Sequence, residues 1–201
     1  MCGAWFGRKF AARRQSAALR VLAEDYRLRS IELTLTVTGR TWTSQRSVEI
    51  ESLRDGLIDY PIGKVLGGDV PLGTPVFTGV AGDLRQAGDP TLTDEYYVFR
   101  LRRPLARGER ARLDSRMAGS RDDLELVPWW SWRSARPVDR LELRVVFDDA
   151  SLPPGDIRFQ VLDESRKAVS DEPVLKIGDA REFRRTIPNP VPAWTYQFRW
   201  D

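Results

Sequence analysis

The residues of this sequence whose types could support acid–base chemistry are its paired carboxylates. Two carboxylates can act together in glycoside hydrolysis or hold a calcium ion. Glu49 and Glu51 would share one face of a strand, and adjacent acidic pairs recur along the chain. Most of these pairs stand at or beside the ends of predicted strands, where acidic residues are common in solvated turns. We therefore interpret them as turn residues; they include Asp94-Glu95, Asp122-Asp123, Asp148-Asp149, Asp163-Glu164 and Asp171-Glu172.

The sequence contains few of the residues that other kinds of catalysis require. Histidine is absent, which removes the usual general base of serine and cysteine hydrolases and the commonest metal ligand. The single cysteine, Cys2, excludes an intrachain disulfide. Gly63-Lys64 lacks the earlier glycine of a phosphate-binding loop, because that position is Ile58. We expect no catalytic residue, no metal site and no cofactor, and a carboxylate-based hydrolase is the enzymatic alternative.

Basic residues are concentrated between Arg100 and Arg116, where seven arginines face only two acidic residues. We expect this segment to form a β-hairpin that projects alternate arginines from one face. Such a basic ribbon could hold the phosphates of a nucleic acid, another anion or an acidic partner. The structural alternative is a solvated face on which arginine stems cover apolar surface. The candidate binding residues are Arg100, Arg102, Arg110, Arg112 and Arg116.

Three tryptophans follow Pro128 and form a second candidate binding group: Trp129, Trp130 and Trp132. Adjacent residues of a strand point to opposite faces, so Trp129 and Trp130 cannot both be core residues of one face. An exposed tryptophan would suit a carbohydrate platform or a contact with a protein partner. Packing in the core or at an edge is the structural alternative.

A basic helix is predicted over residues 8–26, where Phe10, Ala17, Val21 and Leu22 have helical spacing and no glycine or proline intervenes. Residues 1–27 hold six basic and two acidic residues, a net charge of +4, and the remaining chain is near neutral at −1. This segment could lie on an anionic membrane surface or a nucleic acid, or it could pack against the rest of the protein.

After residue 27 the pattern changes to that of β-strands. Apolar and polar residues alternate over residues 28–38 and again over 41–53, and the short Gly39-Arg40 link indicates a hairpin. The clearest strand is the last, where Trp194, Tyr196, Phe198 and Trp200 alternate with polar residues. Further strands are predicted at residues 76–80, 95–103, 109–117, 124–132, 140–147, 156–162, 174–177 and 182–187.

This series of short strands predicts an all-β fold with one N-terminal helix. We expect a mainly antiparallel β-sandwich, immunoglobulin-like or related, over residues 28–201. A subdivision of the sandwich near residues 119–123 is the alternative, because turn residues gather there. The composition, 41% apolar and 30% charged, is that of a globular protein with a real core.

No uninterrupted apolar segment in the sequence has the length of a signal peptide core or a membrane span. We therefore expect a cytoplasmic protein. Arginine greatly outnumbers lysine, which a GC-rich coding sequence would also produce, so the charge balance alone is weak evidence for nucleic acid.

The runs VDRLELRVVF (residues 138–147), RSVEIESLRDGLIDYPI (46–62) and the aromatic ending WTYQFRW resemble the C-terminal β region of uncharacterised actinobacterial regulator-like proteins. The resemblance covers most of residues 28–201. It implies a bacterial sensing or interaction module and transfers no catalytic residue.

The function expected from the sequence is a non-enzymatic binding module that recognises a protein partner or effector. Nucleic-acid or anion binding through the arginine-rich segment is one alternative. Carbohydrate binding through exposed tryptophan is another.

Overall fold

The computed structural model describes residues 24–39, 41–62, 76–78, 82–87, 96–120, 129–133, 136–148, 155–174 and 181–200. The described residues are almost entirely β-strand, and every strand pair except one is antiparallel. The prediction of an all-β fold with antiparallel sheets is confirmed. Most of the predicted N-terminal helix lies outside the described residues, but its last residue, Tyr26, already belongs to the first strand.

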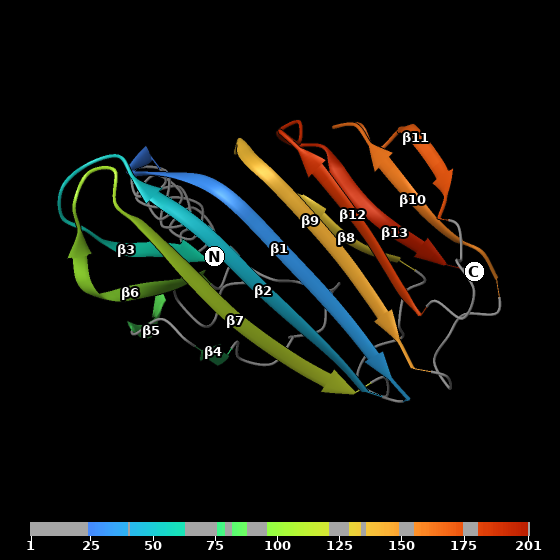
Figure 1. Ribbon diagram of the computed structural model, residues 1–201, viewed down its shortest axis with the longest axis horizontal. Helices are drawn as coiled ribbons and strands as arrows, with labels where there is room; N and C mark the ends of the chain where they lie inside the picture. Colours follow the sequence, from blue (N-terminus) through green and yellow to red (C-terminus); the bar gives the residue numbers. More distant parts are fainter. Residues whose placement is uncertain are drawn as a thin grey trace, which may run out of the picture.

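The largest sheet has six strands in the order β12-β9-β1-β2-β7-β4 (Figure 1). Its centre is the hairpin of β1 and β2, in which Thr38 pairs with Thr41 across the predicted Gly39-Arg40 turn. Gly39 has a φ of 54°, a left-handed conformation that glycine adopts without strain. The parallel pairing of β1 with β9 brings the second half of the chain into this sheet. The strands are β1 (Tyr26–Thr38), β2 (Thr41–Ser52), β4 (Val76–Thr78), β7 (Arg110–Ser120), β9 (Val138–Phe147) and β12 (Glu182–Pro188).

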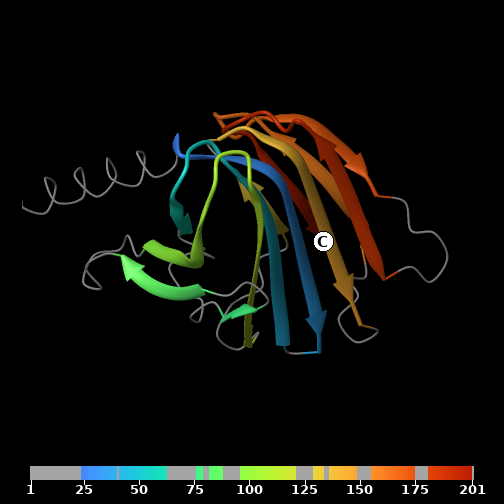
Figure 2. The same ribbon diagram turned by 60° about the vertical axis from the view of Figure 1, so that its left-hand side comes forward.

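Two smaller sheets lie on the same side of the six-stranded sheet, at its two ends (Figures 1 and 2). One has the order β3-β6-β5, with β3 at Leu57–Ile62, β5 at Gly82–Ala87 and β6 at Tyr96–Leu105. The other has the order β11-β10-β13-β8. Its strands are β8 (Trp129–Arg133), β10 (Ile157–Leu162), β11 (Ala168–Pro173) and β13 (Thr195–Trp200).

Aromatic contacts join the sheets around one continuous core. The ring centroids of Tyr26 on β1 and Tyr60 on β3 are 5.1 Å apart. At the other end, Phe147 on β9 meets Trp200 on β13 edge to face, with centroids 5.3 Å apart. Phe147 also contacts Phe183 of the neighbouring β12. The inward face of the large sheet is therefore apolar along its length, which leaves its other face to solvent.

Strand β7 extends to Ser120, inside the region 119–123, and β9 begins at Val138; both strands belong to the six-stranded sheet. Division into a segment 1–27 and a domain 28–201 stays a prediction. No helix among the described residues has the length and apolar character needed to cross a membrane.

Candidate functional site

The solvent face of the six-stranded sheet carries charged side chains of both signs. This charged face results from strand alternation, because β1, β2, β7 and β9 each turn one face to the core and the other outward. A β-bulge between Leu28 and Ser30 adds a residue to β1 relative to β2. The added residue is Arg29, which the bulge places among the outward side chains, beside Ser30.

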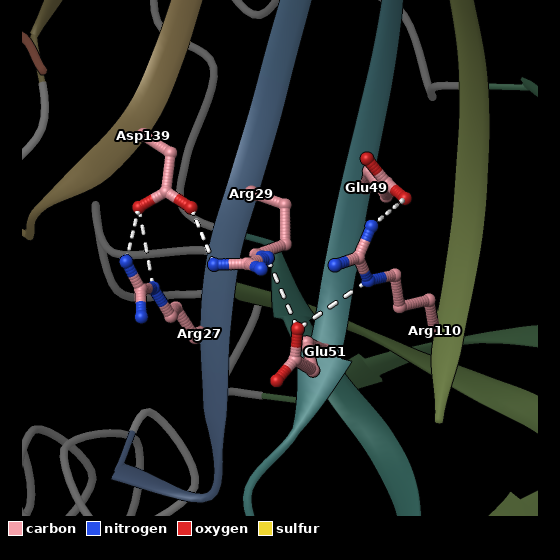
Figure 3. A network of polar contacts seen from close by, with 6 residues as sticks. All are labelled: Arg27, Arg29, Glu49, Glu51, Arg110 and Asp139. Carbon is pink, nitrogen blue, oxygen red and sulfur yellow. Dashed lines mark hydrogen bonds and ion pairs between the residues drawn. The ribbon is translucent and has the colours of Figure 1, made fainter. Parts of the chain in front are cut away.

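Arg29 lies at the centre of a network that crosses three strands (Figure 3). Its Nη1 lies 2.7 Å from Asp139 Oδ2 on β9, and its Nε lies 3.0 Å from Glu51 Oε2 on β2. The other oxygen of Asp139 accepts hydrogen bonds from Arg27, at 2.8 Å from Nη2 and 3.2 Å from Nε. One carboxylate thus holds two guanidinium groups in place.

The same network continues to β7 through Arg110 (Figure 3). Arg110 Nε lies 3.3 Å from Glu51 Oε2, and Nη1 lies 3.6 Å from Glu49 Oε1. The neighbouring Arg112 contacts Asp114 at 3.2 Å and Glu32 at 3.6 Å. Glu51 is therefore shared by arginines of two different strands, Arg29 and Arg110.

A second network covers β9 and β12. Arg140 and Arg184 both bind Glu142 Oε2, at 2.7 and 2.6 Å. Arg144 forms a two-pronged contact with Glu182, with its Nε 2.7 Å from Oε1 and its Nη2 2.6 Å from Oε2. The hydrogen bonds from Arg144 hold the pKa of Glu182 below its ordinary value, although burial opposes them. The carboxylate of Glu182 is therefore ionised at neutral pH.

A hollow of about 640 Å³ lies in this face between the two networks. Four arginines and two glutamates stand around it together with two serines, so a ligand there would meet donors, cations and anions at once. The lining residues are Arg29, Ser30, Glu32, Ser47, Glu49, Arg110, Ala111, Arg112 and Arg140. Among the described residues, no group of three or more His, Cys, Asp or Glu could hold a metal ion.

The arginine-rich segment is not a β-hairpin. Strand β6 pairs with β3 and β5, whereas β7 pairs with β2 and β4, so the two strands belong to different sheets. The prediction was wrong because strand pairing depends on partners far away in sequence, here β2 and β3. The candidate arginines are consequently divided between two surfaces.

Most of the candidate arginines also have acidic partners. Arg100 on β6 binds Asp59 of β3 through two hydrogen bonds of 2.8 and 3.0 Å, which raise the pKa of Arg100. Arg110 and Arg112 belong to the network on the large sheet. Within the described part of the chain, Arg102 and Arg116 are exposed and make no ion pair. The acidic partners reduce the attraction of this region for phosphate.

The tryptophans divide as neighbouring strand residues must. Trp130 and Trp132 on β8 pack against the core, with the ring of Trp132 6.2 Å from that of Tyr196. Trp129 is 45% exposed and points to the other face of the four-stranded sheet. Of the three, Trp129 is the one with a ring accessible to a ligand.

Two of the acidic pairs contain an aspartate that is held by structural partners. Asp163 accepts hydrogen bonds from Ser165 and Lys167 in a turn, and Asp171 accepts them from Arg158 and Gln160. Sequence reasoning missed Arg27, Arg29 and Asp139 as members of a network. Alternation in residues 28–38 indicated an outward polar face, but nothing local indicated that β9 lies beside β1.

No protein-family model and no curated protein matches this chain. Solved structures with a similar fold include an M1 zinc metallopeptidase from Deinococcus radiodurans, with a TM-score of 0.52 and 14% identity over 87% of this chain and 42% of that chain. Leukotriene A4 hydrolase from Saccharomyces cerevisiae has a TM-score of 0.53 and 8% identity over 87% of this chain and 29% of that chain. The chain spans less than half the length of either structure, and at these identities the likeness shows the fold alone.

Proposed function

We propose that this chain is a non-enzymatic β-sandwich module that binds a protein partner through the outer face of its six-stranded sheet. The observation that carries the proposal is the ion-pair network centred on Arg29 and Glu51, beside a hollow of about 640 Å³. It presents fixed charges of both signs over several strands. Complementary charge patterns of this kind give protein interfaces their specificity and orientation.

A protein partner fits this face better than a nucleic acid does. Phosphates carry one sign of charge, whereas Glu32, Glu49 and Glu51 stand among the arginines and would repel them. A protein surface can offer acidic side chains to the arginines and basic side chains to the glutamates. The mixed pattern therefore favours the protein partner over the arginine-mediated phosphate binding considered from the sequence.

Preorganisation adds to this argument. Free arginine side chains lose conformational entropy when they become ordered at an interface, at a cost of about 0.5–1.5 kcal/mol each. Arg29 and Arg110 are already held by carboxylates on neighbouring strands. A partner that binds between them meets side chains whose positions are fixed in advance.

The peptidase and hydrolase activities named for the similar structures are not proposed here. This chain covers 42% of the M1 metallopeptidase and 29% of the leukotriene A4 hydrolase, so the likeness does not indicate which part of either protein carries its activity. Zinc sites draw their ligands mainly from histidine and cysteine, and this sequence has no histidine and one cysteine. These facts support the non-enzymatic proposal.

Site-specific photo-crosslinking tests the proposed surface. A photoreactive amino acid is placed at Thr34 or Gln45, which point outward on β1 and β2, and at the exposed Val169 on β11 as a control. We expect a crosslinked protein from the first two positions and none from Val169. The double charge reversal Glu49→Arg with Arg112→Glu should abolish crosslinking, whereas Arg102→Ala on the three-stranded sheet should not.

Two results would overturn the proposal. Crosslinking of the same protein from Val169, or crosslinking that survives the double reversal, would place the contact elsewhere. Turnover of a peptide, glycoside or nucleotide substrate that disappears when Glu49 or Glu51 becomes glutamine would show an enzyme instead.

A further inference from the structure

The solvent face of the four-stranded sheet carries a second, different group of side chains. Strands β8 and β13 pair with Trp129 opposite Arg199, Ser131 opposite Gln197 and Arg133 opposite Thr195. Trp130 and Trp132 pack inward, so these six residues share the outward face. The face combines one large aromatic ring with hydroxyl, amide and guanidinium groups.

Trp129 is a large apolar surface in this polar setting. Its side chain is 45% exposed, whereas its neighbours Trp130 and Trp132 are partly buried against the core. Exposed indole costs free energy in water, and a flat apolar ligand face that covers it recovers that free energy. The ligand must also tolerate polar groups immediately beside the ring.

A ladder of side-chain hydrogen bonds fixes one of these polar groups, the amide of Gln197. Gln197 Nε2 donates to Gln160 Oε1 at 2.7 Å, and Gln160 Nε2 donates to Asp171 Oδ2 at 3.0 Å. Gln160 is only 8% exposed, so it acts as a support beneath the surface. With its amide nitrogen committed to Gln160, Gln197 keeps its Oε1 as an acceptor for a ligand.

Two further groups on β8 are available to a ligand. Ser131 has no hydrogen-bond partner among the described residues. The exposed Arg133 has neither a hydrogen-bond partner nor an ion pair among the described residues. Arg133 thus differs from Arg29 and Arg144 of the six-stranded sheet, which are held by carboxylates. Trp129, Ser131 and Arg133 stand at alternate positions of one strand, so they extend over ~13 Å.

We propose that this face binds an acidic oligosaccharide, one with a carboxylate on its sugar ring. The apolar face of one sugar ring covers Trp129, and the ring hydroxyls, which both donate and accept, match Ser131 and Gln197 Oε1. A carboxylate of another sugar unit pairs with the guanidinium of Arg133. Trp129, Ser131, Gln197 and Arg133 each have a partner in this ligand class.

A single-stranded nucleic acid fits the face less well. Such ligands stack successive bases on several aromatic side chains, and this face presents one exposed ring. Phosphate oxygens accept hydrogen bonds and cannot donate them, so Gln197 Oε1 would face another acceptor.

Calorimetric titration with three probes tests the proposal: an oligogalacturonate, a neutral cello-oligosaccharide of equal length and an oligothymidylate. We expect the oligogalacturonate to bind most tightly. Trp129→Ala should weaken its binding by roughly tenfold or more, and Trp129→Phe should weaken it less because a ring remains. Arg133→Gln should remove the preference for the acidic over the neutral oligosaccharide.

Matched controls separate this site from the protein-binding surface. Arg102→Ala and the double reversal Glu49→Arg with Arg112→Glu, on other sheets, should leave saccharide binding unchanged. Thermal melting checks that each variant is folded. Failure of the oligogalacturonate to bind, tighter binding of the oligothymidylate, or unchanged binding by folded Trp129→Ala would each overturn the proposal.

Discussion

Arg29 Nη1 lies 2.7 Å from Asp139 Oδ2, although the two residues are 110 positions apart in the sequence. The contact joins β1 to β9, the one parallel pair in the described part of the fold. Because Asp139 also binds Arg27, its carboxylate ties two side chains of β1 to β9. Asp139 therefore contributes both to the charged surface and to the join between the two halves of the chain.

We predict that Asp139→Asn destabilises the protein by about 1 kcal/mol, as measured by urea unfolding at low ionic strength. The change keeps the size of the side chain but removes the charge that Arg27 and Arg29 share. Since these side chains are partly exposed, salt should reduce the difference from the native protein. The matched change Glu164→Gln, at an exposed residue outside the networks, should cost less than about 0.5 kcal/mol. Equal effects of the two changes would contradict the prediction.

The last strand should be essential to the fold. Phe198 on β13 is fully buried, and β13 lies between β10 and β8 in its sheet. We predict that Phe198→Ala costs about 3–5 kcal/mol in the free energy of unfolding. Removal of residues 195–201 should abolish cooperative folding, because Phe147 and Phe159 lose Trp200 and Phe198, their aromatic partners on β13. Val169→Ala on the exposed edge strand β11 is the control, and its thermal unfolding should match that of the native protein.

Local pattern predicted the strands that have one buried face. Residues 28–38, 41–53 and 140–147 alternate clearly, and the structure places β1, β2 and β9 there within two residues of the predicted bounds. Three strands were missed for identifiable reasons. Pro61 argues against a strand at β3, β5 contains few apolar residues, and β11 is exposed or half-exposed throughout, so it needs no apolar alternation. The predicted strand at 174–177 lies mostly outside the described residues, and Val174 is not in a strand.

The candidate surfaces could be predicted only in part from the same local pattern. Adjacent tryptophans had to point to opposite faces, but only the pairing of β8 with β13 shows that Trp129 is the exposed one. The partner of Arg29 could not be inferred, because it depends on a parallel pairing between distant strands. Side-chain contacts that depend on the pairing of strands distant in sequence produce no periodic pattern in the sequence.

Gly119 should be required for the packing of Trp42. The two residues are paired across β2 and β7, and a Cβ at position 119 would lie 2.6 Å from Trp42 Cζ2. Trp42 is buried, so its ring has little freedom to move. We predict that Gly119→Ala destabilises the protein by about 1–3 kcal/mol through overpacking. In a Trp42→Leu background the same change should cost much less, and equal costs in both backgrounds would exclude the clash as the cause.

The buried tyrosines should make the protein sensitive to alkali. Burial raises the pKa of Tyr26 well above the ordinary value of a tyrosine, the nearby Tyr60 raises it further, and Arg136 and Arg46 oppose both effects. The guanidinium of Arg136 lies 4.2 Å from the centre of the Tyr26 ring. Folding therefore favours the neutral phenol, whereas the unfolded chain ionises near pH ~10.

The sign of the pH dependence follows from that difference. A group whose pKa is raised by folding contributes its full stability below the unfolded pKa, and that contribution is lost as the pH rises. We predict that the free energy of unfolding is level between pH 8 and 9 and falls above pH ~10. Tyr26→Phe should reduce the steepness of the fall, while the change of an exposed residue, Arg102→Gln, should not. Urea unfolding across this pH range measures the free energy of unfolding of both variants. An unaltered dependence of that free energy on pH in Tyr26→Phe would assign the loss of stability at alkaline pH to other groups.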